Sequence, residues 1–185
     1  SEAQINRAKY DLALENAIEG SAADPTSLDG YLMLGRSLVR LELWQEALAP
    51  LLTYVAYSGE DHRGWSDLGR AQLGAEQTEA AGESLNRALE INPRYSPAYL
   101  ARGWLMLELG DYEAGMQSLG EARRFGSESF ELYLAIGTGY YDLGRNQQAL
   151  EAARQALTFA NLEEDRELHD LMFSRGYALR ALVSE

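Results

Sequence analysis

Four five-residue stretches open on an aromatic residue and close on a glycine: Tyr31–Gly35 (YLMLG), Trp65–Gly69 (WSDLG), Tyr99–Gly103 (YLARG) and Tyr133–Gly137 (YLAIG). Each glycine stands at the same distance along the chain from the one before it. The aromatic residue and the glycine are four positions apart, so they share one face of a helix. A glycine inside a helix costs roughly 0.5–1 kcal/mol relative to alanine. Four glycines in register therefore predict a repeated helical unit with a closely packed interface.

A second set of positions recurs after each glycine. Small residues stand twelve positions on, mostly leucines sixteen on, and mostly alanines nineteen on. These residues are Ala47, Ala81, Gly115 and Ala149; Leu51, Leu85, Leu119 and Ala153; and Tyr54, Ala88, Ala122 and Ala156. The pattern predicts a second helix in each unit that packs on the first. Burial of each large side chain in this interface stabilises the fold by roughly 1.5–3 kcal/mol.

These positions resemble the tetratricopeptide repeat, a helix–turn–helix unit whose period matches the spacing of the glycines. Leu85–Pro93 (LNRALEINP) resembles the second helix and exit of that unit, and Leu109–Gly115 and Leu143–Ala149 resemble its inter-helix turn. The resemblance covers about residues 28–161. It implies an all-α fold, a right-handed α-solenoid of stacked repeats. Arg102 and Gly115 depart from the family pattern, so we expect looser packing in the third unit.

We predict a single solenoid domain. Its parts are a partial repeat or N-terminal capping helix over residues 1–27, full repeats over 28–61, 62–95, 96–129 and 130–163, and a C-terminal capping helix over 164–185. Ala13 and Ala17 fall at second-helix positions, so the chain opens inside a repeat. A fragment of a longer protein is the preferred interpretation, and a terminal cap is the alternative. Gly176 breaks the register, as expected of an atypical end repeat.

Composition narrows the class of partner. The net charge of −13 argues against nucleic acids and anionic membranes as partners. No stretch is apolar and long enough to suggest insertion into a membrane. The chain has no cysteine, which removes disulfide and thiolate chemistry, and the sequence does not fix the compartment. Fifteen of the sixteen basic residues are arginine, a side chain suited to binding carboxylates.

No constellation of residues predicts catalysis. His62 and His169 lie far apart and lack companion ligands, so we expect no metal. Gly137–Tyr141 (GTGYY) lacks the third glycine and the preceding strand of a dinucleotide loop, so we expect no cofactor. The acidic run Glu163–Asp165 is predicted to open a helix, where carboxylates complement the helix dipole. The chain is not expected to be an enzyme.

In the tetratricopeptide repeat family, the first helices line a concave surface that binds an extended peptide or a partner helix. The face opposite the packing stripe supplies the candidate groove residues. They are Leu32, Arg36, Arg40, Arg63, Arg70, Leu100, Trp104, Leu107, Leu134, Thr138, Tyr141 and Tyr177. We expect the arginines to bind carboxylates of a protein or peptide ligand, and the remainder to bind its apolar side chains. The alternative is that the arginines only pair with Asp29 and Asp67, or with Glu and Asp residues on adjacent helices. Trp104 would then contact the terminal helix or belong to a filled inner wall.

Some tetratricopeptide domains clamp the carboxylates of chaperone tails with Lys and Asn side chains. The corresponding places here hold Leu32, Arg36, Asp67, Pro97 and Ala101. Only one of the five is basic, so chaperone-tail binding is not expected.

The preferred functional prediction is a non-catalytic scaffold for protein–protein interaction. A second possibility is a regulatory or substrate-presenting segment of a larger enzyme or of a secretion or assembly machine. A third is self-association, as a homodimer, through the ends of the solenoid. The apolar residues Ile5, Leu12, Leu14 and Ile18 suggest an uncovered stripe at the N-terminal end.

Overall fold

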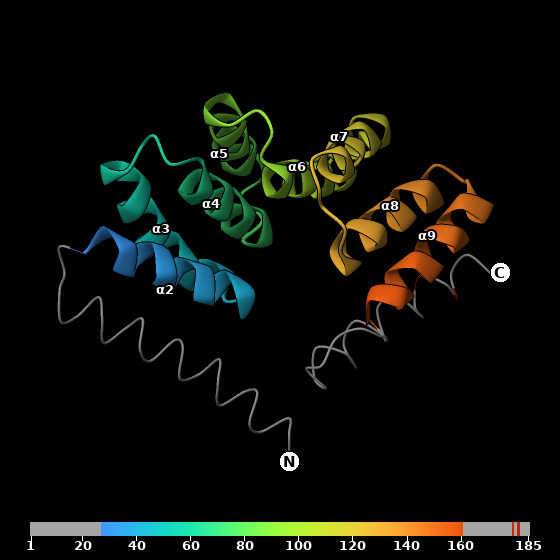
Figure 1. The fold of residues 1–185 in the computed structure, drawn as a ribbon, viewed down its shortest axis with the longest axis horizontal. Coiled ribbons are helices and arrows are strands. Elements are labelled where there is room, and N and C mark those ends of the chain that lie inside the picture. Colours follow the sequence, from blue (N-terminus) through green and yellow to red (C-terminus); the bar gives the residue numbers. More distant parts are fainter. Residues whose placement is uncertain (1–26, 161–178, 180, 182–185) are drawn as a thin grey trace, which may run out of the picture. The chain divides into compact units, whose positions relative to one another are not determined.

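The computed structural model describes residues 27–160, 179 and 181 of the 185-residue chain. In residues 27–160 every regular element is a helix. The eight helices are α2 (Leu28–Arg40), α3 (Trp44–Tyr57), α4 (His62–Gly74), α5 (Thr78–Ile91), α6 (Ser96–Glu108), α7 (Tyr112–Arg124), α8 (Phe130–Asp142) and α9 (Asn146–Ala160) (Figure 1). This confirms the predicted all-α helical repeat solenoid, and the hand of its superhelix stays a prediction. The predicted terminal segments, 1–27 and 164–185, lie almost wholly outside the described residues.

The helices form hairpins that begin at even intervals along the chain. The first helices α2, α4, α6 and α8 start at Leu28, His62, Ser96 and Phe130, and each is followed by its second helix. These starts repeat with the same period as the register glycines. Contacts group the described residues into two compact units, one ending at Ala101 and the other beginning at Arg102, inside α6. The assignment of all repeats to a single domain stays a prediction.

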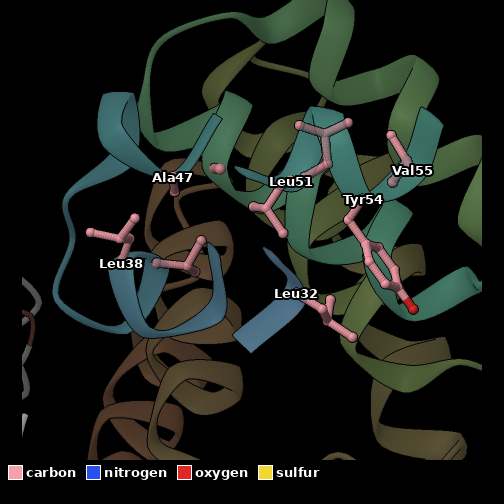
Figure 2. Close-up of a cluster of buried hydrophobic side chains, with 9 residues drawn as sticks. Leu32, Leu38, Ala47, Leu51, Tyr54 and Val55 are labelled. Carbon is pink, nitrogen blue, oxygen red and sulfur yellow. The ribbon is translucent and has the colours of Figure 1, made fainter. Parts of the chain in front are cut away.

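The register glycines are contact points between the two helices of a hairpin. A Cβ atom on Gly69 would lie 2.7 Å from Leu85 Cγ, and one on Gly103 would lie 2.5 Å from Leu119 Cδ2. Gly35 faces Leu51 in the same way, and Leu51 is fully buried among the side chains shown in Figure 2. The glycine therefore leaves room for the leucine of the second helix, as the spacing predicts.

In the fourth hairpin a different residue fills the space beside the register glycine. Ala153 stands at the leucine position relative to Gly137 and is too small to reach it. Leu179 occupies the space instead, since a Cβ atom on Gly137 would lie 2.5 Å from Leu179 Cδ2. Leu179 is buried and forms a core cluster with Ala149 and Ala153. A residue beyond the last full repeat thus completes the packing of that repeat.

The third hairpin is not loosely packed where the sequence departs from the family pattern. Leu107 fills the space beside Gly115, because a Cβ atom there would lie 2.8 Å from Leu107 Cδ2. Arg102 is half-buried, and its Nε donates a hydrogen bond of 3.2 Å to Ser118 Oγ on α7. The expectation of looser packing is wrong at both positions, because neighbouring side chains fill the space and satisfy the polar group.

The turns within the hairpins share one backbone conformation. Gly110 and Gly144 have positive φ angles of 77° and 69°, and Glu42 and Glu76, at the equivalent positions, have φ angles of 56° and 61°. The left-handed region costs a residue with a Cβ atom roughly 1–2 kcal/mol. The first two hairpins therefore make with a glutamate a turn that the last two make with glycine.

Candidate functional site

We refer to Arg36, Arg40, Arg63 and Arg70, on α2 and α4, as the arginine patch. Arg36 Nε donates to Asp67 Oδ2 over 2.5 Å and links the two helices. This contact is one of the pairings that the sequence leaves open as an alternative to ligand binding. Asp67 is partly buried, and burial raises the pKa of its carboxyl although Arg36 and Arg70 act to lower it. Water therefore solvates the Asp67 carboxylate only in part.

Arg63 is held by Asp61, the N-cap of α4. Arg63 Nη2 lies 2.9 Å from Asp61 Oδ2, and the Arg63 backbone N–H donates to Asp61 Oδ1 over 2.9 Å. The hydroxyl of Tyr54, on α3, donates to Asp61 Oδ2 over 2.6 Å. Burial acts to raise the pKa of Asp61, but the hydrogen bonds from Arg63 and Tyr54 outweigh it and hold that pKa well below its ordinary value. Asp61 thus has a structural role between α3 and α4.

The other two members of the arginine patch, Arg40 and Arg70, are exposed. Within residues 27–160, neither forms an ion pair with a carboxylate. Tyr95 lies close to the charges of this surface, and its pKa is raised by burial and by the nearby Asp67 carboxylate. The arginine patch has four arginines, and only two aspartates pair with them, Asp67 with Arg36 and Asp61 with Arg63. The patch therefore retains a net positive charge.

The other candidate residues differ widely in exposure. Leu32 is only 5% exposed and belongs to the core of the first hairpin. Leu107 is 6% exposed and packs against Gly115 and Gly139. Both side chains therefore offer little surface to a ligand, because neighbouring helices cover that part of the first-helix face. Leu100 is half-buried, in the unit that ends at Ala101.

The unit that begins at Arg102 contains the rest of the predicted apolar strip. Trp104 and Leu134 are half-buried, and Tyr141 is exposed. Leu134 packs against the cluster that contains Leu179. The Thr138 hydroxyl donates to the Leu134 carbonyl over 3.0 Å, so it is engaged within its own helix. Tyr177 lies outside the described residues.

One cleft is lined by none of the candidate groove residues. It lies on α7, α8 and α9 and is lined by Met116, Arg123, Tyr133, Ile136, Glu151 and Gln155, among others. Gly120 also lines the cleft, and no atom beyond its own helical turn lies within 4 Å of the place of a Cβ atom. The sequence carries a weak signal for it, since Leu52, Asn86 and Arg154 stand where Gly120 does in the other units.

The described part of the chain contains neither a cluster of metal ligands nor a helix that could span a membrane. His62 contacts Asn92 Nδ2 through Nε2 at 3.2 Å, and its ring meets Tyr95 edge-on at 4.5 Å between centroids. No group of three or more potential metal ligands occurs in residues 27–160. None of the helices described here combines the length and the apolar character needed to cross a membrane.

Comparison with known proteins decides the family. Sequence models described as tetratricopeptide repeat match residues 62–95, 84–117 and 130–161. These residues form tetratricopeptide repeats. A solved tetratricopeptide repeat protein, TTC0263 of Thermus thermophilus, is 26% identical, with a TM-score of 0.74 over 94% of both chains. Such arrays are protein-interaction modules and are generally non-catalytic.

Further proteins are similar to this chain in structure or in sequence. MamA is 22% identical over 85% of this chain and 92% of its own, with a TM-score of 0.64. YrrB, described as a TPR protein with an unusual peptide-binding site, is 19% identical over 90% of this chain and 86% of its own, with a TM-score of 0.57. The BBSome complex member BBS4 of Bos taurus is 27% identical over 135 residues, 73% of this chain. The chain spans only 26% of that relative's length.

Proposed function

We propose that this tetratricopeptide array is a non-catalytic scaffold that binds the carboxylates of a protein or peptide ligand at the arginine patch. The observation that carries the proposal is the state of Arg40 and Arg70. Both are exposed, and neither has an ion-pair partner within residues 27–160. In a chain of net charge −13, such a local excess of arginine is a site where an acidic ligand escapes the general repulsion.

The ion pair with Asp67 leaves Arg36 available to a ligand. Partly exposed ion pairs contribute little to stability, with a median of about 0–1 kcal/mol. Arg36 can therefore turn from Asp67 toward a ligand carboxylate at small cost, and its planar guanidinium suits bidentate binding. Arg63 is less available, because Asp61 holds it with three side-chain hydrogen bonds. Arg36, Arg40 and Arg70 are thus the expected ligand contacts.

A separate surface, in the unit that begins at Arg102, is proposed for apolar side chains of a ligand. Its members are half-buried Trp104 and exposed Tyr141, and aromatic residues of this kind are common hot spots of interfaces. Leu107 is buried and Leu134 packs in the core, so both contribute less to this surface. The YrrB description as a peptide-binding protein supports the same class of ligand here.

A binding assay tests the arginine patch. Labelled peptides rich in Asp and Glu, and matched peptides with Asn and Gln, are titrated with wild type and with Arg40→Glu/Arg70→Glu. We expect the acidic peptides to bind, and the double variant to weaken that binding about ten-fold or more, a loss of about 1.4 kcal/mol. Arg154→Glu, an exposed change on α9, is the control. Equal binding to wild type and to a folded double variant would overturn the proposal.

A role within a larger assembly is the second candidate. It is supported by the likeness to BBS4, a member of a complex and a protein of which this chain spans about a quarter. The complete open reading frame is the test. A catalytic or further helical domain encoded in the same frame would favour this role, and a frame of the present length would remove it.

A further inference from the structure

The second helices present three equivalent positions to solvent in each repeat. Their spacings of three and four place them on one helix face. In α5 they are Glu83, Asn86 and Glu90, in α7 Gln117, Gly120 and Arg124, and in α9 Glu151, Arg154 and Thr158, and all nine are exposed. None of the nine has an aliphatic or aromatic side chain, as expected of a helix face in water.

Helix α3 departs from this rule at all three positions. It carries Ala49, Leu52 and Ala56 there, all exposed, and Tyr57 follows directly. Leu52 is 50% exposed and Tyr57 is 76% exposed. We call these four residues the α3 ridge. No charged residue occurs between Glu46 and Glu60, a segment that includes most of α3.

The core does not require the α3 ridge. Leu51, Tyr54 and Val55, on the opposite face of the same helix, are the buried residues that pack within the first hairpin (Figure 2). At the positions of Ala49, Leu52 and Ala56 the other second helices have polar residues or glycine, so the repeat architecture does not demand apolar ones there. The position of Tyr57 is apolar in every unit, but Tyr57 is the most exposed of the large hydrophobic residues that the structure describes. Leu52 and Tyr57 are thus large exposed apolar side chains that the core does not use. Exposed apolar side chains gathered on one surface are typical of interaction sites.

We infer that the α3 ridge docks an amphipathic helix of another protein, with Lys or Arg flanking its apolar side at both ends. From Ala49 to Tyr57 a helix rises about 12 Å, or about two turns. That length matches a helical ligand anchored at positions i, i+3 or i+4, and i+7.

Charge at the two ends of the α3 ridge selects the partner. Glu46 stands before the ridge and Glu60 after it, and both are exposed. Glu60 pairs with Arg87 but remains 85% exposed at its side chain, so it stays accessible to a second cation. A second copy of this chain would bring the same glutamates and a further charge of −13 to the interface. A basic, heterologous helix is therefore favoured over a homodimer.

Three synthetic helical peptides test the inference by fluorescence anisotropy. The first has Leu and Phe at i, i+3, i+4 and i+7 with Lys at both ends. The second has the same apolar side with Glu at both ends, and the third keeps Lys but has Gln on the apolar side. We expect the first to bind, and the other two to bind about ten-fold or more weakly. Absence of binding by the first peptide, or equal binding by all three, would contradict the inference.

Matched variants locate the binding on the protein. Leu52→Glu and Tyr57→Glu should each weaken the first peptide about ten-fold or more, whereas Asn86→Glu, at the position in α5 equivalent to Leu52, should not. These side chains are exposed, so the variants retain the fold, which circular dichroism checks. Undiminished binding to folded Leu52→Glu refutes the assignment. A wild-type dimer in sedimentation that Leu52→Glu dissociates would assign the ridge to a second copy and refute the basic partner.

Discussion

Replacement of Gly103 by alanine should destabilise the array, whereas the same replacement at Gly120 should stabilise it. Both glycines lie inside helices of one compact unit, Gly103 in α6 and Gly120 in α7. Alanine is favoured over glycine inside a helix by roughly 0.5–1 kcal/mol. Gly120 has nothing within 4 Å of a new Cβ atom, so this gain is the whole effect there.

At Gly103 the new methyl group meets the core. It would lie 2.5 Å from Leu119 Cδ2 and 2.6 Å from Leu119 Cγ, and Leu119 is fully buried, so a shift of its side chain disturbs its own neighbours. Overpacking of this kind typically costs about 1–3 kcal/mol, which exceeds the helix-propensity gain. The net loss at Gly103 is therefore up to about 2.5 kcal/mol.

Urea denaturation followed by circular dichroism measures both variants against wild type. A double-mutant cycle isolates the contact, because Leu119→Ala removes the obstructing side chain. The cost of Gly103→Ala should then fall, with a coupling of about 1 kcal/mol or more. If Gly103→Ala stabilises the protein as much as Gly120→Ala does, close packing of leucine on glycine is not the reason for a glycine at this position.

Three further outcomes follow from the structure. Glu42→Gly should raise the free energy of unfolding by about 0.5–1 kcal/mol in urea titrations, since glycine removes the left-handed strain but also loosens the unfolded chain; a loss of stability would contradict this. Asp61 has a lowered pKa in the fold, so its stabilisation is complete above its unfolded pKa of about 3.9 and is lost as the pH falls below it. Asp61→Asn should therefore flatten the acid limb of the stability profile, and an unchanged slope would count against the pairing. Leu179→Ala should cost about 2–5 kcal/mol in thermal or urea melts, and Ala153→Leu should recover part of it; no recovery would mean that the two residues do not share one space.

The helices and their pairing are predictable from the sequence because an even repeat spacing constrains every copy at once. The glycine-to-leucine contacts follow from helix periodicity alone, as the Gly69–Leu85 and Gly103–Leu119 packing confirms. The role of Leu179 is not predictable in this way. It lies beyond the register break, and only the missing bulk at Ala153 indicates that another side chain must fill the space.

The candidate site is less predictable than the fold. Helix periodicity places Leu32 and Leu107 on the first-helix face, but it does not say how much of that face a neighbouring helix covers, and both are buried. The pairing of Arg36 with Asp67 depends on rotamers that spacing does not determine. Three residues of the α3 ridge, Ala49, Leu52 and Ala56, can be recognised in the sequence when equivalent positions of all four second helices are compared. Tyr57 cannot, because Ile91, Phe125 and Phe159 at its position are also apolar.

Backbone NMR of the array during titration with an acidic peptide tests the central claim most directly. Binding at the arginine patch predicts that amide shifts change along α2 and α4, around Arg36, Arg40 and Arg70, and that Arg40→Glu/Arg70→Glu abolishes them. Shift changes confined to the second helices α3 and α5, or none at peptide concentrations in the millimolar range, would contradict a carboxylate-binding surface on the first helices.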